Sequence, residues 1–325
     1  MKMRIEALSY PLERPFHITG YEFRAADTVR VTLEDGAYRG RGEGMGIYYH
    51  GESQQGMLAQ LEAVVQAVEA GISRAQAREL LPAGGALNAL DCALWDLEAK
   101  RAGASVWQLL GMSPKALTTV CTIGIDKPQV MAELARSYQR YPHLKIKLSN
   151  DAPIERLEAI RAARPDADLV IDVNQGWSIE ELKEYAPAAQ RLGVAMIEQP
   201  LRRGDDEALE GYRSPVPLGA DESCLHAEDY ARVGRHYQVI NIKLDKCGGL
   251  TQALALAELA RRDGKDLMVG NMTGSSLSMA PAYVIGQTCR FVDIDGPLFL
   301  TRDIAGGLVY GDGGVVSVPG PDLWG

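Results

Sequence analysis

The sequence has no run of about 18 apolar residues, the length that a transmembrane helix needs. Its first residues, MKMRIEALSYPLERPFH, mix charges among apolar side chains and show no signal-peptide core. The five cysteines are widely spaced and form no CxxC pair, which is typical of reduced thiols. These absences predict a cytoplasmic protein without a membrane span.

The sequence also lacks clusters of basic residues. It has 34 Lys and Arg against 43 Asp and Glu, a formal net charge of −9. Nucleic-acid surfaces need clustered Lys and Arg, so we expect no nucleic-acid partner. No low-complexity segment divides the 325 residues, of which 46% are hydrophobic. That length suits one barrel with a smaller domain, or two ordinary domains.

Two different patterns follow each other along the chain. Before residue 113, strand patterns at 3–10 and 27–34 and helical patterns at 57–68 and 86–101 predict an α+β domain over 1–112. From Thr119 onward, apolar runs alternate with amphipathic helical patterns, which predicts an α/β barrel over 113–325. The eight expected strands are 119–125, 144–148, 169–174, 195–199, 218–222, 239–244, 267–272 and 291–295. A Gly-rich tail follows the last strand, so we expect the C-terminus to return to the first domain.

Five charged residues recur at nearly constant spacing: Lys147, Asp172, Glu198, Asp221 and Lys243, separated by 25, 26, 23 and 22 residues. This spacing suits one strand, one helix and two loops, so each residue is expected at the same point of successive βα units. Each lies near the carboxyl end of its strand, where barrel enzymes place their active sites. The pattern predicts that all five meet at one mouth of the barrel.

The three acids predict a cation site. Acids near strand ends more often cap helices or form surface pairs, but three on consecutive strands favour a shared metal. Asp172, Glu198 and Asp221 offer only hard oxygen ligands, which suits one Mg²⁺ per subunit, with Mn²⁺ as a substitute. Asn174 shares the face of Asp172 because side chains alternate along a strand, and we expect it to contact a ligand residue.

The two lysines predict proton transfer at carbon. A lone lysine on a strand is more often a surface residue. Lys147 and Lys243, however, fall on strands two and six of eight and therefore face each other across a barrel. One base on each face of a carbon is what a 1,1-proton transfer requires. A nearby cation would lower the lysine pKa values, and Lys145 would help stabilise an enediolate.

Several strings resemble the enolase superfamily in its muconate-lactonising branch: LKIKL, DVNQGW, IEQP, ADES and INIKLDKCGG. The resemblance implies a capping domain on a (β/α)7β barrel, with Lys147 and Lys243 as bases and Asp172, Glu198 and Asp221 as metal ligands. Muconate cycloisomerases, o-succinylbenzoate synthases and N-acylamino acid racemases share these residues, so the strings leave these activities open.

The string VDIDGP separates these alternatives. It places Asp293 and Asp295 on one face of the last strand, and two carboxylates suit an ammonium group. In dipeptide epimerases of this family, a matching Asp-x-Asp binds the substrate ammonium. An Asp-Gly turn is the competing explanation.

TIGID, NALDCALWDLEAKR and NIKLDK also resemble L-Ala-D/L-Glu epimerases. By this resemblance Thr122, within TIGID, contacts substrate, and Arg24 receives the glutamate side chain. A solvated Arg24 is the alternative. Tyr48, Tyr49 and His50 are expected near the same pocket, where the rings would equally favour an apolar side chain, and His50 is expected to be exposed.

We therefore expect a Mg²⁺-dependent dipeptide epimerase, with a small-molecule substrate and a possible homo-oligomeric state. A racemase or cycloisomerase of the same branch is the enzymatic alternative. A barrel that binds metal and ligand without turnover is the other alternative, although a binding protein needs no base on each face.

Overall fold

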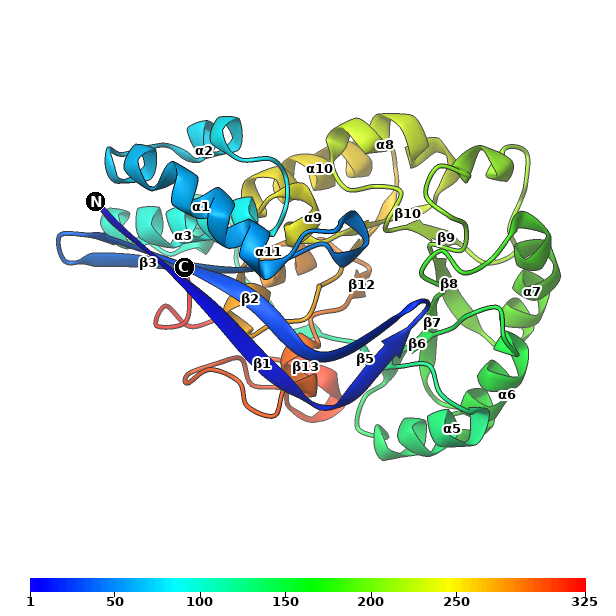
Figure 1. The fold of residues 1–325 in the computed structure, drawn as a ribbon. Coiled ribbons are helices and arrows are strands. Elements are labelled where there is room, and N and C mark those ends of the chain that lie inside the picture. Colours follow the sequence, from blue (N-terminus) through cyan, green and yellow to red (C-terminus); the bar gives the residue numbers. More distant parts are fainter.

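The computed structural model covers residues 1–325, and its first part is an antiparallel sheet backed by helices (Figure 1). The sheet has the order β1-β2-β3. Its strands are β1 (Lys2–Ile18), β2 (Tyr21–Asp35) and β3 (Tyr38–Met45). The helices of this part are α1 (Gln54–Glu69), α2 (Arg74–Leu80), α3 (Gly85–Ala102) and α4 (Val106–Leu109).

Strand β3 and helix α2 were not predicted from the sequence. The glycines of β3 explain its missing apolar alternation, because helix α3 lies directly on them. A Cβ atom on Gly40, Gly42 or Gly44 would lie only 2.1 to 2.3 Å from a carbonyl oxygen of α3. The absence of side chains at these three positions therefore allows α3 to pack against the sheet.

The second part is the predicted barrel, with eight strands in the order β12-β11-β10-β9-β8-β7-β6-β5. All neighbouring pairs are parallel. The ends meet where Val120 N donates to Val292 O at 2.9 Å. The strands are β5 (Cys121–Ile123), β6 (His143–Lys147), β7 (Asp168–Asp172), β8 (Val194–Glu198), β9 (Leu218–Ala220), β10 (Val239–Ile242), β11 (Asp266–Val269) and β12 (Phe291–Val292). The predicted (β/α)7β barrel with an α+β capping domain is confirmed.

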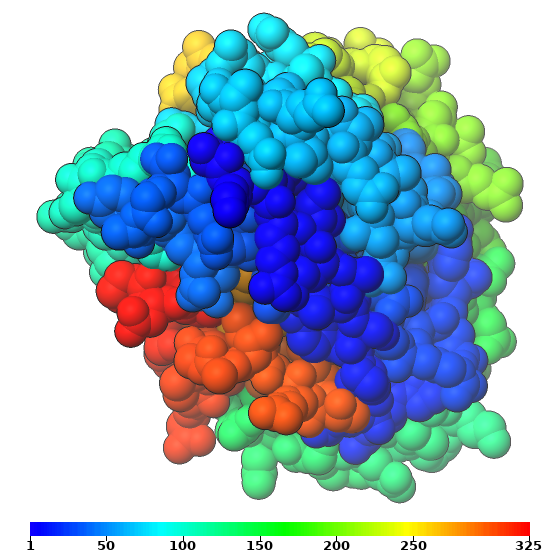
Figure 2. All heavy atoms as spheres, turned by 60° about the vertical axis from the view of Figure 1, so that its left-hand side comes forward, coloured from blue at the N-terminus to red at the C-terminus, as the bar shows by residue number.

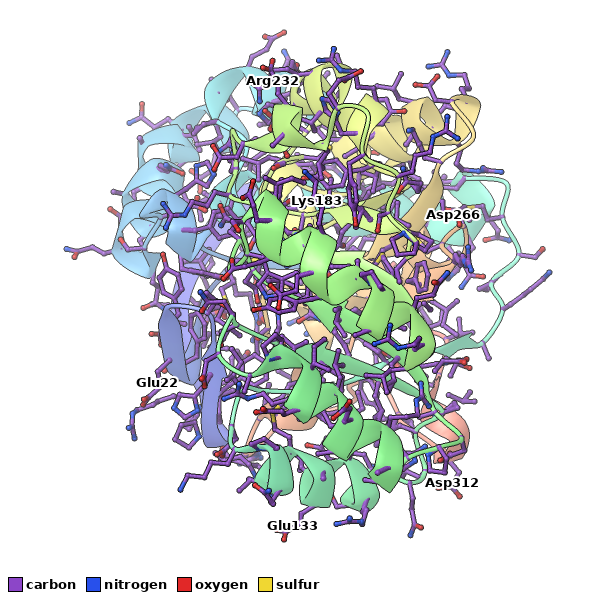
Figure 3. All side chains as sticks on the ribbon, turned by 90° about the vertical axis from the view of Figure 1, so that its right-hand side faces the viewer. Glu22, Glu133, Lys183, Arg232, Asp266 and Asp312 are labelled. Atoms are coloured by element: carbon purple, nitrogen blue, oxygen red, sulfur yellow. The ribbon has the colours of Figure 1, made fainter.

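Helices surround the barrel, and Figure 3 shows α5, α6 and α7 side by side on its outer face. The α-helices are α5 (Pro128–Ser137), α6 (Pro153–Ala163), α7 (Ile179–Arg191), α8 (Ala227–Val233), α9 (Leu244–Cys247), α10 (Leu250–Arg262) and α11 (Ser276–Gly286). The 3-10 turns are η1 (Tyr48–His50), η2 (Asp206–Leu209), η3 (Gly234–His236), η4 (Gly296–Phe299) and η5 (Asp312–Gly314). Strand β8 is followed by η2 only. None of these helices combines the length and the apolar character that crossing a membrane demands.

Inside the barrel, apolar and charged side chains occupy different levels. Val170, Met196, Val239 and Met268 form a buried cluster against which Phe291 packs. The charged residues Lys147, Asp172 and Glu198 stand at the last positions of their strands. The apolar cluster thus fills the barrel interior beneath these charged residues, which lie at the carboxyl ends of the strands.

No α-helix follows β12, and the tail instead returns to the first part of the molecule. Strand β13 (Val315–Val316) pairs with β4 (Leu117–Thr118). Farther on, Trp324 Nε1 donates to Cys92 O of α3 at 2.9 Å. Figure 2 shows the tail, in orange and red, lying against the blue strands of the capping sheet.

Asp245 connects the capping part to the barrel. It lies in α9, is buried, and accepts hydrogen bonds from Met45 N (2.9 Å) and Asn88 Nδ2 (2.7 Å). Burial raises the pKa of this carboxyl group to about 7, and the nearby Glu52 and Glu43 add to the effect.

We expect this group to make stability fall with rising pH. Because the folded protein binds the proton more tightly than the unfolded chain, whose Asp pKa is about 3.9, the free energy of unfolding should decrease between about pH 4 and pH 7. Asp245→Asn should reduce that decrease by roughly 2–4 kcal/mol. Urea unfolding at pH 5 and pH 8 measures it, and an equal decrease in both proteins would contradict this role.

Candidate active site

The three predicted acids converge at the carboxyl end of the barrel. Asp172 ends β7, Glu198 ends β8, and Asp221 directly follows β9. All three are fully buried, and one oxygen of each lies within 4.8 Å of the others. Three carboxylates held this close repel one another, and their hard oxygen atoms suit a cation.

Two carboxylate oxygens are available to a cation, because no hydrogen-bond donor occupies them. Glu198 Oε2 and Asp221 Oδ2 are buried and accept no hydrogen bond of good geometry. Only ammonium groups approach them, Lys145 Nζ at 2.8 Å and Lys243 Nζ at 2.7 Å respectively. Hard, unsatisfied carboxylate oxygens are the donor set that Mg²⁺ prefers, so the residues fit this ion.

The two predicted bases stand on opposite walls. Lys147 lies on β6 and Lys243 directly follows β10, four strands away in the eight-stranded order. Lys147 Nζ contacts Asp172 Oδ2 at 2.6 Å and Asn174 Oδ1 at 3.0 Å. Both lysines line one small cavity of about 50 Å³. A carbon held in this cavity would therefore have an amine on each side.

A second group of charges lies beside the acids. Lys145 Nζ is within 3.1 Å of Asp172 Oδ2 and within 2.9 Å of Asp293 Oδ2. Asp295 makes no such ion pair; its Oδ2 instead accepts a hydrogen bond from Thr122 N at 2.8 Å. Asn271 Nδ2 reaches both aspartates, at 2.9 Å from Asp293 Oδ1 and 3.4 Å from Asp295 Oδ1. One buried aspartate is thus balanced by a lysine and the other is not.

The acids differ strongly in pKa. Burial opposes ionisation of Asp172, but Lys147 and Lys145 outweigh it and lower the pKa to about 2. Burial and the charge of Asp172 raise the pKa of Glu198 to about 7. Burial and Asp293 raise the pKa of Asp295 well above its usual value. Burial is the largest cause of the two raised pKa values, and a neighbouring carboxylate is the second.

The carboxylates around Lys243 and Lys145 raise the pKa values of these two lysines. Burial opposes the charge of Lys243, yet attraction by Asp221 prevails and raises its pKa. The pKa of Lys145 is raised as well, against burial, by Asp293, Glu198 and Asp172. The expected lowering therefore requires the additional positive charge of a cation among these carboxylates.

Aromatic rings of the capping part cover the cavity. Phe23 and Tyr48 line it, and their ring centroids are 5.1 Å apart. The turn between β1 and β2 reaches the barrel through Thr19 Oγ1, which is 3.1 Å from Leu148 O. Met272 and Thr273, from the segment after β11, also line the cavity, and Met272 belongs to the cluster against which Tyr48 packs.

Most of the residues expected near the substrate do not line this cavity: Arg24, Tyr49, His50, Thr122, Lys145, Asp293 and Asp295. The Arg24 side chain is 75% exposed and pairs with Glu22 at 2.6 Å, and Figure 3 shows Glu22 at the edge of the molecule. His50 is exposed, as expected, and lies 2.7 Å from Arg203 Nη1. A larger cavity of about 590 Å³ lies beside Thr122 and Phe16, but neither the three acids nor Lys147 and Lys243 line it.

The sequence-based site set omitted three buried polar residues, Lys246, Asn241 and Glu222, and the half-buried Asn271. Lys246 Nζ lies 2.6 Å from Asp221 Oδ1, whereas Lys243 pairs with the other oxygen, Oδ2. Asn241 Nδ2 donates to Glu198 Oε1 at 2.6 Å. Glu222 and Asn271 contact Asn174 and Asp293 respectively. Lys246 lies three residues after Lys243, and this helical spacing could have indicated that the two are close. Glu222 directly follows the ligand Asp221, and no spacing in the sequence indicates its role.

A closed barrel that gathers three buried acids and two opposed lysines at one end defines a class of metal-binding barrels equipped for proton transfer at carbon. Residues 2–111 match the mandelate racemase / muconate lactonizing enzyme N-terminal domain, and residues 129–321 match the enolase C-terminal domain-like family. The chain therefore belongs to the mandelate racemase and muconate lactonizing enzyme family of the enolase superfamily.

Named relatives lie within this family. The L-Ala-D/L-Glu epimerase of Escherichia coli is 41% identical over 94% of this chain and 96% of its own. An N-acetyl-D-glutamate racemase of a Pseudoalteromonas species is 45% identical over 72% of this chain and 74% of its own.

Solved structures agree with this membership. An enolase family member from Agrobacterium tumefaciens, described as homologous to dipeptide epimerases and holding sodium and L-Ala-L-Glu, superposes with a TM-score of 0.96 at 41% identity, covering 99% of both chains. A dipeptide epimerase from Enterococcus faecalis, complexed with Mg and L-Leu-L-Tyr, gives a TM-score of 0.91 at 29% identity, covering 98% of this chain and 96% of its own.

Proposed function

We propose that this protein is a Mg²⁺-dependent dipeptide epimerase that inverts the α-carbon of the C-terminal residue. The observation that carries the proposal is the position of Lys147 and Lys243 on opposite walls of one cavity beside three buried acids. Relatives named L-Ala-D/L-Glu epimerase support the substrate class, and L-Ala-D/L-Glu dipeptides, such as those derived from murein, are the first to test.

Asp172, Glu198 and Asp221 would hold the ion. When bound, Mg²⁺ supplies positive charge that stabilises the negative charge developing on the substrate carboxylate. Lys145, buried within 2.8 Å of Glu198 and 3.1 Å of Asp172, adds a fixed ammonium to the same region.

Lys147 and Lys243 would exchange the roles of base and acid between the two directions of epimerisation. One lysine, as a neutral amine, removes the α-proton, and the other, as an ammonium, delivers a proton to the opposite face. The stereochemistry inverts because the amines approach from opposite walls, and no residue has to move across the cavity.

Asp293 and Asp295 would bind the substrate ammonium group. Lys145 already balances Asp293, at 2.9 Å, so Asp295 is the buried carboxylate that lacks a cation. The ammonium of a dipeptide would supply that charge, whereas an N-acylamino acid has none to offer. Thr122, whose backbone holds Asp295, would line this end of the site. Arg24 stays a candidate for the C-terminal side chain only if it leaves Glu22.

N-acylamino acid racemisation is the second candidate, because one relative at 45% identity is named a racemase of N-acetyl-D-glutamate. Incubation with Mg²⁺ in D₂O separates the two. We expect one deuterium at the C-terminal α-carbon of L-Ala-L-Glu, detected by mass spectrometry, and at least about 100-fold slower exchange of N-acetyl-glutamate. Faster exchange of N-acetyl-glutamate would contradict the proposal.

Removal of the metal is expected to abolish exchange. Treatment with a chelator, followed by dialysis, should stop deuterium uptake, and Mg²⁺ or Mn²⁺ should restore it. Because the ion binds only the folded site, saturating Mg²⁺ should also raise the melting temperature. A Mg²⁺ concentration of 100 times the dissociation constant would add about 2.7 kcal/mol to the free energy of unfolding. Glu198→Gln should lose this increase, which calorimetry measures; an increase retained in full would contradict Glu198 as a ligand.

We also place the capping domain at residues 1–112, completed by part of the C-terminal tail, and the catalytic barrel at 113–325. The five free thiols agree with a reducing, cytoplasmic setting.

A further inference from the structure

The side chain of Asn174 connects a proposed base to a buried acid. Asn174 Oδ1 accepts a hydrogen bond from Lys147 Nζ at 3.0 Å, and Asn174 Nδ2 donates to Glu222 Oε1 at 3.1 Å. All three residues are buried, and Lys147 and Asn174 also line the cavity. Glu222 makes no other side-chain hydrogen bond, and its Oε2 is buried without a partner.

The orientation of this amide decides what Lys147 meets. A primary amide has an accepting oxygen on one side and a donating nitrogen on the other. Glu222 Oε1 is an acceptor and selects the nitrogen, so the oxygen is left for Lys147. The reversed amide would place two donors against each other and would leave Lys147 with Asp172 alone.

The position of Lys147 depends on two acceptors, the Asp172 carboxylate and the Asn174 amide oxygen. Asp172 Oδ2, at 2.6 Å, draws the Lys147 ammonium toward the proposed metal ligands. The Asn174 oxygen provides the second acceptor and fixes the direction of the amine within the cavity. Lys243 has no equivalent support, because its ion pair is with Asp221. The Asn174 side chain therefore contacts Lys147 and not Lys243.

We propose that Glu222 is a positioning residue that orients Lys147 through Asn174, and so controls proton transfer on one face of the substrate carbon. The inference rests on the proposed function and adds to it a functional difference between the two lysines. The backbone of Asn174 has a φ of +44°, a left-handed conformation that Asn and Gly tolerate. Position 174 therefore accepts Gly without a change of backbone.

Three variants of the Mg²⁺-loaded protein test this role. Glu222→Met removes the acceptor while keeping a side chain of similar length. Glu222→Gln is the matched control, since its amide oxygen can accept from Asn174. Asn174→Gly removes the connecting amide. For L-Ala-L-Glu and L-Ala-D-Glu in D₂O, NMR would follow epimerisation and, separately, deuterium uptake without inversion.

Glu222→Met should slow epimerisation about 10-fold. The loss should be equal in both directions, because the variant does not change the equilibrium constant between the epimers. A 10-fold loss is a modest part of the roughly 10²–10⁴-fold rate increase that general acid–base catalysis contributes. Uptake without inversion should fall about 10-fold for the epimer deprotonated by Lys147 and stay within about twofold for the other. Asn174→Gly should give the same rates as Glu222→Met. The double variant, with both substitutions, should be no slower than either single variant. Glu222→Gln should keep most of the wild-type rate.

Equal loss of uptake from both epimers would overturn the inference, because it would mean that Glu222 supports the whole site. Wild-type rates in Glu222→Met would overturn it as well. If Glu222→Met does not fold, Asn174→Gly carries the same face-specific test. Absence of uptake in the wild-type protein would refute the proposed function itself, which separates that failure from this one.

Discussion

Epimerisation by Lys147→Ala or Lys243→Ala is expected to fall at least about 1000-fold, within the range attributed to general acid–base catalysis. Each variant keeps one amine, so it should still exchange the α-proton of one epimer with solvent, and the two variants should select opposite epimers. This asymmetry follows from the opposite walls that carry the two lysines. NMR of both epimers of L-Ala-Glu in D₂O measures it.

Lys183→Ala provides the matched control, because Lys183 is exposed on α7, on the outer face of the barrel (Figure 3). We expect wild-type rates from this variant. If Lys147→Ala and Lys243→Ala retained exchange from the same epimer, the lysines would not serve opposite faces, and two-base catalysis would be wrong.

Asp295→Asn is expected to lower kcat/KM for L-Ala-L-Glu by about 100-fold, equivalent to about 2.7 kcal/mol, because a buried ammonium would lose its carboxylate partner. Asp295 tests this role more cleanly than Asp293, whose carboxylate also pairs with Lys145 at 2.9 Å. An Asp293 variant would free Lys145 and disturb the acids beside it.

The comparison substrate is N-acetyl-L-Ala-L-Glu, which has no ammonium group. Steady-state kinetics with both compounds should show a large preference for the free dipeptide in the wild-type protein and a much smaller one in Asp295→Asn. A variant with an unchanged preference would show that Asp295 does not recognise the ammonium, and N-acyl substrates would then become the stronger candidates.

The barrel was predictable because its periodicity is local. Each strand is a short apolar run and each helix an amphipathic pattern, so the eight strands were recognised from Thr119 onward. Strand β3 was missed because its glycines leave no apolar alternation, and only the position of α3 shows why they are there. The covering of the cavity by Phe23 and Tyr48 likewise depends on a contact between the capping part and the barrel.

The sequence by itself determined the convergence of Lys147, Asp172, Glu198, Asp221 and Lys243. Residues at equal positions of parallel βα units reach the same mouth of a barrel, whatever the details of the loops. Regular spacing therefore carried enough information for a cation site with an amine on each side.

Only the tertiary structure decided how these groups are held and balanced. The hydrogen bond between Asn174 and Glu222 joins residues 48 positions apart, and the one between Thr122 and Asp295 joins residues 173 apart. Such contacts depend on side-chain direction and loop path, which no local pattern encodes. The same holds for Arg24, whose exposed position beside Glu22 follows from the course of the capping strands.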